Sequence, residues 1–377
     1  MSGIYIHIPF CKQACHYCDF HFSTSMKKKE EMVMALAKEI ALRKDEFKDD
    51  VVETIYFGGG TPSILEIADV RFLINEVYQN YTVSENPEIT IEANPDDLSE
   101  DRIIELSKNQ VNRLSIGVQS FHEEDLLLMN RAHNATEAKK CLELATQYFE
   151  NISVDLIYGI PGLTNEKWMQ NIQVLLDLNI PHISSYALTV EPKTALATLI
   201  KNGKIPSPDD GVAHEQFLLL VATLEANGFV HYELSNFGKP DYFSRNNSAY
   251  WLGKKYIGIG PSAHSYDGEN RSWNIANNAL YLKALAENKL PNEIETLTKT
   301  DRYNEYVMTG LRTVWGVSLE RIKNEFGNDY LDYLLQNAQR FLEDEKLIVT
   351  NGVLKTTNKG KFFCDGIASD LFWLNLE

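Results

Sequence analysis

The 377-residue sequence is poor in cysteine, in positive charge and in long apolar segments. Its five cysteines are too few for a secreted fold that depends on disulfides. No apolar run approaches the roughly 18 residues of a membrane-spanning helix, and no basic patch followed by an apolar stretch marks a signal peptide. We therefore expect a cytoplasmic protein in a reducing compartment, with no feature that indicates contact with a membrane surface.

Acidic residues outnumber basic ones. The chain has 53 Asp and Glu residues against 36 Lys and Arg residues, so its formal net charge is −17. Proteins that bind nucleic acid broadly need a basic surface, so this balance argues against a nucleic-acid partner. The length suits one large domain followed by a small one.

Short apolar strands alternate with helical patterns over the first half of the chain. Strands are expected at residues 4–8, 52–57, 88–93, 113–118, 151–157 and 182–188. Helices are expected at residues 27–47, 65–78, 100–108, 136–148 and 166–178. This alternation is typical of a parallel sheet with helical crossovers. Periodicity alone does not distinguish a closed barrel from an open sheet.

The pattern changes after residue 235, where a stretch rich in Gly, Ser, Asn and aromatic residues begins. Residues 289–299 resemble a polar linker, and helical patterns follow at 301–313, 319–325 and 330–344. Two strands, 347–350 and 353–356, flank Asn351-Gly352, a pair typical of a tight hairpin. We therefore divide the chain into residues 1–235, a connector at 236–290 and a winged-helix-like α+β module at 291–377.

Three of the five cysteines, Cys11, Cys15 and Cys18, follow the first strand in a C-x3-C-x2-C arrangement. This spacing lets three thiolates face one inorganic centre, and thiolates suit zinc and iron–sulfur clusters. Four ligands would complete a structural site, whereas three leave a position open for chemistry. A zinc site is an alternative, and nearby histidines would then supply the fourth ligand.

The cysteine loop, with Tyr17 before its last cysteine, resembles the signature of the radical S-adenosylmethionine (SAM) enzymes. In that family three cysteines hold three irons of a [4Fe–4S] cluster, and the amino and carboxylate groups of SAM chelate the fourth iron. The resemblance implies an α/β fold, a partial (β/α)6-type radical SAM barrel followed by the small carboxy-terminal module. Gly59, Gly60 and Thr61 resemble the glycine-rich motif that receives the amino group of SAM. A phosphate-binding loop fits poorly, because its lysine is missing.

Polar residues interrupt or end the later strands. Together with the motifs above, they resemble the SAM-contacting positions of oxygen-independent coproporphyrinogen III oxidases. The resemblance implies that SAM is bound by Tyr5, Tyr17, Gly59, Gly60, Thr61, Glu92, Gln119, Arg131, Asp155 and Ala187.

Two departures from those oxidases resemble the HemW-type heme chaperones instead. The oxidases carry a fourth cysteine two residues after the third, where this sequence has Phe20. They also have an extension before the first strand, at which this sequence begins. HemW proteins bind heme and are implicated in delivering it to respiratory enzymes.

HemW proteins also carry a His-Asn-x-x-Tyr-Trp motif linked to heme binding, and here Asn246 replaces its histidine. An amide is a poor ligand for heme iron compared with imidazole or thioether. The candidate heme-binding residues are Asn246, Tyr250 and Trp251, with His264 as a substitute ligand. The aromatic pair can also be ordinary packing, and His264 a hydrogen-bonded structural residue.

The leading hypothesis is a radical SAM iron–sulfur protein that binds SAM and heme and acts as a heme chaperone for respiratory heme proteins. Its recipient protein and electron donor are not identified by the sequence. The alternatives are an oxygen-independent coproporphyrinogen III oxidase and another radical SAM enzyme acting on a tetrapyrrole. No catalytic residue is assigned. Cys141 and Cys364 are expected to be inert thiols.

Overall fold

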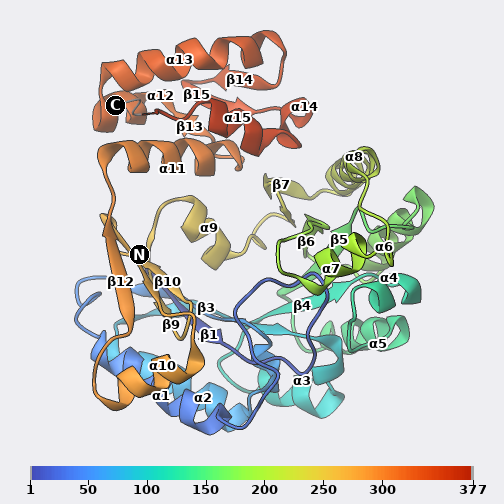
Figure 1. The fold of residues 1–377 in the computed structure, drawn as a ribbon, viewed down its shortest axis with the longest axis vertical. Helices are drawn as coiled ribbons and strands as arrows, with labels where there is room; N and C mark the ends of the chain where they lie inside the picture. The colour runs from blue at the N-terminus through green and yellow to red at the C-terminus, as the bar shows by residue number, and fades with distance from the viewer. Residues whose placement is uncertain (1, 375–377) are drawn as a thin grey trace.

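The structure, a computed structural model, describes residues 2–374, and a 12-stranded sheet forms its body (Figure 1). The strand order is β12-β11-β10-β9-β1-β2-β3-β4-β5-β6-β8-β7, and the strands from β9 to β6 in this order run parallel. The parallel strands are β9 Lys255–Ile259, β1 Ser2–Ile8, β2 Val52–Gly59, β3 Val83–Ala93, β4 Arg113–Gln119, β5 Ile152–Tyr158 and β6 His182–Ala187. This arrangement confirms the predicted α/β fold with an incomplete barrel.

Antiparallel strands extend both edges of the parallel region. On one edge, β8 (Asn236–Gly238) pairs with β6, and β7 (Val230–Glu233) pairs with β8. On the other edge β10 pairs with β9, β11 with β10 and β12 with β11. Their bounds are β10 His264–Tyr266, β11 Asn270–Asn274 and β12 Asn292–Thr296.

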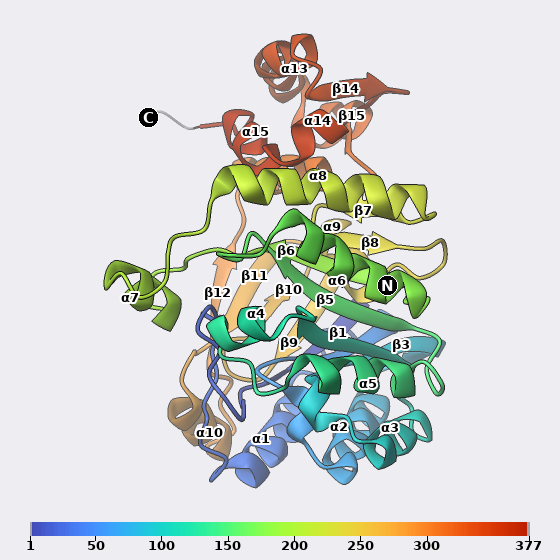
Figure 2. The same cartoon turned by 90° about the vertical axis from the view of Figure 1, so that its right-hand side faces the viewer.

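Helices cover the outer face of the sheet, because the strands alternate between apolar and polar side chains. Ile4, Ile6 and Ile8 are buried in one cluster with Leu36 of α1, whereas Tyr5 lies on the opposite, inner face. Figures 1 and 2 show the helices wrapped around the curved sheet. Their bounds are α1 Lys29–Leu42, α2 Ile67–Asn80, α3 Glu100–Ser107, α4 Glu123–Leu128, α5 Ala135–Ala145, α6 Asn165–Asp177, α7 Ala195–Lys201, α8 Asp210–Ala226 and α10 Asn278–Ala286.

Several of these helices begin at capping residues. The side chains of Ser99 and Thr164 accept hydrogen bonds from backbone N–H groups in the first turns of α3 and α6. Asn134 and Glu137 form a capping box at the start of α5. Short 3-10 turns, η1 (Pro62–Ile64) and η2 (Pro95–Asp97), follow β2 and β3 at the end of the sheet that carries the cysteine loop.

The carboxy-terminal module has its own apolar core and a small sheet in the order β13-β15-β14. Asn351 and Gly352 have φ angles of 52° and 74°, as the predicted tight hairpin requires. Figure 2 shows the module stacked beyond α8, at one end of the molecule. Its elements are α11 Lys299–Leu311, β13 Val317–Ser318, α12 Leu319–Arg321, η3 Ile322–Phe326, α13 Asn328–Glu343, β14 Leu347–Thr350, β15 Val353–Thr356, α14 Asn358–Lys361 and α15 Cys364–Asp370.

The structure differs from the sequence-based expectation in several places, and helices α4, α7, α8 and α10 lie where none was expected. The helix expected at residues 27–47 ends at Leu42, and the buried Arg43 turns inward to donate to the carbonyl of Gly258 over 2.9 Å. Residues 236–290, expected to be a connector, supply strands β8 to β11, which join the main sheet, and helix α9 (Arg245–Trp251). The expected polar linker contains β12. Of the helices within residues 2–374, none is long and apolar enough to cross a membrane.

Candidate cluster and cofactor site

A cavity of about 140 Å³ lies at the carboxyl ends of the parallel strands, and all three loop cysteines line it. We call it the cluster cavity. Of the residues predicted to bind the cluster or SAM, it is lined by Cys11, Cys15, Tyr17, Cys18, Gly59, Gly60, Thr61, Glu92, Gln119, Arg131 and Asp155. The carboxyl ends of parallel strands meet at one edge, so residues from five strands converge there.

Backbone contacts hold the cysteine loop in place. Cys11 N–H donates to the carbonyl of Ser23 over 3.1 Å, and His16 N–H donates to that of Met129 over 3.0 Å. Gln13 Nε2 donates to the carbonyl of Asn130 over 2.8 Å. The loop is therefore attached to the segment after α4, which carries Arg131.

Burial raises the pKa of the Cys11 thiol, and it raises the pKa of Cys18 to about 11. Thr61 Oγ1 donates to Cys11 Sγ over 3.5 Å, and Arg131 Nη1 donates to Cys15 Sγ over 3.2 Å. Iron binding requires the thiolate form. A hydroxyl and a guanidinium aimed at sulfur stabilise that negative charge.

Close approach of the cysteine loop explains the glycine run. A Cβ on Gly60 would lie 2.5 Å from the carbonyl oxygen of Phe10, and one on Gly59 would lie 2.5 Å from Nδ1 of His7. Gly59 also has a φ of 109°, which side-chain-bearing residues rarely adopt. Thr61 N–H donates to the carbonyl of Phe10 over 2.7 Å. The end of strand β2 is thus packed directly against the start of the cysteine loop.

Two partly buried carboxylates face the cavity without a cationic partner. Burial raises the pKa of Glu92 to about 7 and that of Asp155 to about 6. Tyr56 OH donates to Glu92 Oε1 over 2.8 Å. Within residues 2–374, no Lys, Arg or His nitrogen lies within 4.0 Å of either carboxylate. A ligand that brings positive charge would therefore be stabilised here.

Arg131 is the cation of the cavity. Its Nη2 donates to Asn94 Oδ1 and to the carbonyl of Gly117, both over 2.7 Å. Its Nε is buried without a hydrogen-bond partner in the described part of the chain. Gln119, at a register shift of β4 with a φ of 71°, turns its side chain toward the same cavity. Opposite charges thus line one small space.

The cavity suits a cluster and SAM on these observations. Three thiols face one space, as a cluster needs when each thiolate binds a different iron. SAM carries an ammonium and a sulfonium cation beside a carboxylate, and the cavity offers Glu92 and Asp155 on one hand and Arg131 on the other.

Sequence reasoning missed Asn94, which lines the cavity, anchors Arg131 and donates to Thr61 Oγ1 over 3.4 Å. Its position directly after β3 was the available signal. Two predicted residues do not line the cavity. Tyr5 lies on the inner face, stacked on Tyr56 with ring centroids 6.1 Å apart, and Ala187 ends β6.

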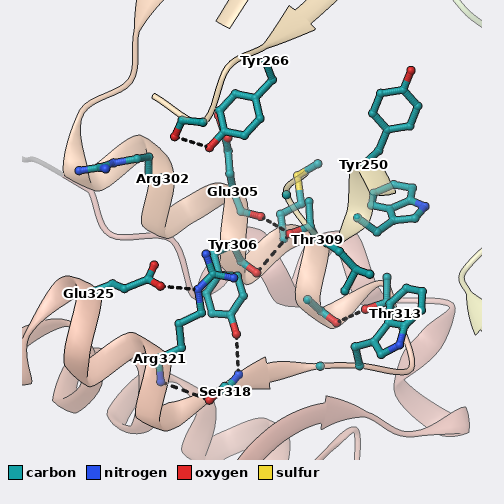
Figure 3. A pocket seen from close by; sticks show the side chains of 18 of the residues that line it. Tyr250, Tyr266, Arg302, Glu305, Tyr306, Thr309, Thr313, Ser318, Arg321 and Glu325 are labelled. Carbon is teal, nitrogen blue, oxygen red and sulfur yellow. Dashed lines mark hydrogen bonds and ion pairs between the residues drawn. The ribbon is translucent and has the colours of Figure 1, made fainter. Parts of the chain in front are cut away.

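Three of the four candidate heme residues lie on α9, and the fourth, His264, lies on β10. Asn246 is buried on α9, where its Oδ1 accepts a hydrogen bond from Thr54 Oγ1 over 3.0 Å. Tyr250 and Trp251 line a cavity of about 660 Å³ between the barrel and the carboxy-terminal module (Figure 3). His264 lines a different cavity of about 600 Å³.

Known proteins resemble this chain over nearly its full length. Residues 5–175 match the Radical SAM superfamily, and residues 297–363 match the HemN C-terminal domain. The heme chaperone HemW of Bacillus subtilis (strain 168) is 34% identical over 96% of this chain and 96% of its own. The HemW protein of Lactococcus lactis subsp. lactis (strain IL1403) is 35% identical over 95% of this chain and 94% of its own. The chain belongs to the HemW family.

HemW proteins share their fold with an oxidase. The structure of coproporphyrinogen III oxidase (HemN) from Escherichia coli, a radical SAM enzyme, matches with a TM-score of 0.85 at 25% identity. The match covers 98% of this chain and 90% of that one. Membership of the radical SAM superfamily implies a [4Fe–4S] cluster and SAM, as the sequence motifs predicted. In this HemW-family chain, Phe20 lines the cluster cavity with 69% of its surface exposed.

Proposed function

We propose that the chain is a heme chaperone that holds a [4Fe–4S] cluster and SAM in the cluster cavity and binds heme at a separate site. The observation that carries the proposal is Phe20, which stands two residues after Cys18 where the oxidases have a fourth cysteine. Similarity to HemW proteins over nearly the whole chain supports the same function. Respiratory heme proteins are the proposed recipients, and the cytoplasm is the proposed location of the chain.

The cluster ligands in this proposal are Cys11, Cys15 and Cys18. A cluster held by these thiolates would supply one-electron chemistry to SAM. The chain's own residues bind and orient: Glu92 and Asp155 offer negative charge to the cations of SAM, and Arg131 faces its carboxylate. Tyr17, Gly59, Gly60, Thr61 and Gln119 complete the proposed contacts around SAM, with Tyr5 and Ala187 outside the cavity wall.

For heme, Tyr250 and Trp251 are the proposed contacts, since both line one large cavity. Asn246, one helical turn before Tyr250 on α9, and His264 remain candidates that do not line this cavity. The proposed division is a barrel (1–235), a middle segment (236–290) that connects the two parts and also joins the main sheet through β8 to β11, and a carboxy-terminal domain (291–377). The electron donor and the recipient protein are partners that the chain requires but does not identify.

The test is anaerobic reconstitution of the full chain with iron and sulfide, followed by heme addition and gel filtration. We expect heme to elute with the protein at about one per chain, and then to pass to an apo-heme protein added in excess. Elution of the protein without heme would reject the chaperone function.

The similarity to HemN favours a second candidate, the SAM-dependent oxidative decarboxylation of coproporphyrinogen III. This activity would release carbon dioxide from that substrate under anaerobic conditions, with SAM and an electron donor present. If the reconstituted chain retains heme and releases no carbon dioxide, the oxidase function is rejected and the chaperone function is supported.

A further inference from the structure

The cavity that Tyr250 and Trp251 line is built by two parts of the chain that are distant in sequence. We call it the interface cavity. One wall comes from the end of α9 and from strands β9, β10 and β11, and the other from α11, β13 and α12. Its volume of about 660 Å³ falls within the range of small-molecule sites. It shares no lining residue with the cluster cavity.

The wall of the barrel is aromatic. Tyr250 meets Tyr256 edge to face with ring centroids 4.4 Å apart, and Tyr266 lies 6.4 Å from Tyr256. Trp251 lies beside them, with the Arg312 guanidinium 5.2 Å from its ring centroid. Rigid aromatic side chains offer large flat contact surfaces at a low cost in conformational entropy. They suit a flat, largely apolar ligand.

The opposite wall carries cations. Along α11 and the residues after it, the lining residues lie mostly three or four positions apart, so they form one face. They are Arg302, Glu305, Tyr306, Thr309 and Thr313. Arg321 follows from α12, and its guanidinium lies 4.2 Å from the centroid of the Tyr306 ring. Figure 3 shows Arg302 and Arg321 on one side of the cavity and Tyr250 on the other.

The charges of the cavity are not balanced internally. Arg271 pairs with Glu305, and Arg321 Nε donates to Glu325 Oε1 over 2.9 Å. For the Arg302 side chain, no hydrogen bond or ion pair occurs within the described residues. Three arginines thus face two glutamates in a chain whose net charge is −17. The surplus among the lining residues is one positive charge, and the guanidinium of Arg302, unpaired within residues 2–374, is a contact point for an anionic ligand.

We infer that the interface cavity binds a tetrapyrrole dicarboxylate, with the ring against Tyr250 and Trp251 and the carboxylates at Arg302 and Arg321. This inference rests on the proposed heme function and assigns it a site, including residues of the carboxy-terminal module. No histidine or cysteine occurs among the described residues that line the cavity. Met308 and tyrosines do line it, and these are kinds of side chain that can bind heme iron. The inference rests on the ring and its acids and not on an iron ligand, so a metal-free porphyrin binds as well.

The test uses the reconstituted full chain and three probes: heme, metal-free protoporphyrin and protoporphyrin dimethyl ester. We expect the two acids to bind with affinities within about 10-fold of each other. The ester, which cannot form charged contacts with arginine, binds roughly 10- to 100-fold more weakly. Equal binding of the acid and the ester by the unmodified chain would overturn the inference, and this arm requires no variant to fold.

The second arm compares the double variant Arg302→Gln/Arg321→Gln with Arg340→Gln. Arg340 is an exposed arginine of the same module, paired with Asp370 on α15 and absent from the cavity lining. The double variant is expected to bind the acids at least 10-fold more weakly and the ester unchanged, whereas Arg340→Gln binds all probes normally. Unaltered acid binding by the double variant would reject the site and leave the chaperone function intact. Failure of the unmodified chain to bind heme would reject that function itself.

Discussion

The cluster cavity and the interface cavity differ in how their residues are brought together. In the cluster cavity, most groups lie in or soon after a strand of one parallel sheet, and short local segments such as Cys11 to Cys18 and Gly59 to Thr61 carry many of them. The interface cavity joins α9 and β9 to β11 with α11 and α12. The cluster cavity is thus a property of local motifs, whereas the interface cavity depends on the packing of two modules.

This difference predicts that the two sites can be disabled separately. The largest effect is expected from Cys15→Ser, which removes one of three cluster ligands. Iron and sulfide bound after reconstitution should fall to near zero, as measured by metal and sulfide analysis. Cys141→Ser, a buried thiol outside both cavities, is the control and should keep its cluster. Equal loss in the two variants would mean that Cys15 is not a ligand.

Gly60→Ala tests whether the cysteine loop depends on close backbone contact. The added Cβ would lie 2.5 Å from the carbonyl oxygen of Phe10, so we expect a loss of about 1–3 kcal/mol in unfolding free energy. Cluster assembly should fall in parallel. Gly366→Ala is the matched control, because that glycine lies on α15 with no atom within 4 Å of its added Cβ. Thermal unfolding curves that coincide for both variants would contradict the packing argument.

Glu92→Gln removes the negative charge and keeps an acceptor for Tyr56. If Glu92 binds a cation of SAM, affinity should fall roughly 10- to 100-fold, since hydrogen bonds to charged groups contribute about 1.5–3 kcal/mol. Calorimetric titration with SAM provides the measurement. The exposed Glu343→Gln on α13 should bind SAM normally. Porphyrin binding should be unchanged in both variants, because Glu92 does not line the interface cavity.

A smaller effect is expected from pH. Burial raises the pKa of Glu92 to about 7 from an ordinary value of 4.5, so the folded chain retains a proton that the unfolded chain releases between these values. The stability of the free protein should therefore fall as pH rises through this window. SAM binds the ionised form, so its affinity should rise with pH up to about 7 and then level.

Tyr56, Asp155 and Arg113 face Glu92, and Asp155 adds to the lower part of the trend because burial raises its pKa to about 6. Unfolding free energy and SAM affinity are each measured between about pH 5.5 and 8.5 to check these two predictions. This range extends about one unit or more on each side of the pKa of Glu92. In Glu92→Gln, both quantities should change less with pH near pH 7, the pKa of Glu92. An equally steep profile in that variant would assign the dependence to another group.

The comparison also explains which parts of the structure sequence reasoning predicted. Strands β1 to β6 and helices α1, α2, α3, α5 and α6 followed from hydrophobic periodicity, whereas the parallel strand β9 did not. The family resemblance predicted that Glu92 and Arg131 lie near the cysteine and glycine motifs, and both line the cluster cavity. Asn94 was missed because its role depends on Arg131, which is brought to it by the fold. The position directly after β3 was a signal for Asn94 as a candidate, but its contact with Arg131 leaves no local pattern.

The antiparallel strands of the main sheet and the interface cavity were not predicted, for related reasons. Strands β8 and β10 have three residues each, too few to show an alternating pattern. Tyr250 and Trp251 were identified from a motif, but Arg302 and Arg321 carry no motif and become partners of the same cavity only when α11 docks. Tertiary packing, rather than local propensity, creates that site.

The central claim is that cluster and porphyrin occupy separate sites of one chain. The most direct measurement is a heme titration of the variant Cys11→Ser/Cys15→Ser/Cys18→Ser, compared with the unmodified chain after reconstitution. We predict about one heme per chain in both proteins, with affinities within about 3-fold of each other, since no cysteine of the loop lines the interface cavity. Loss of heme binding together with the cluster, in a variant that remains folded, would contradict the account.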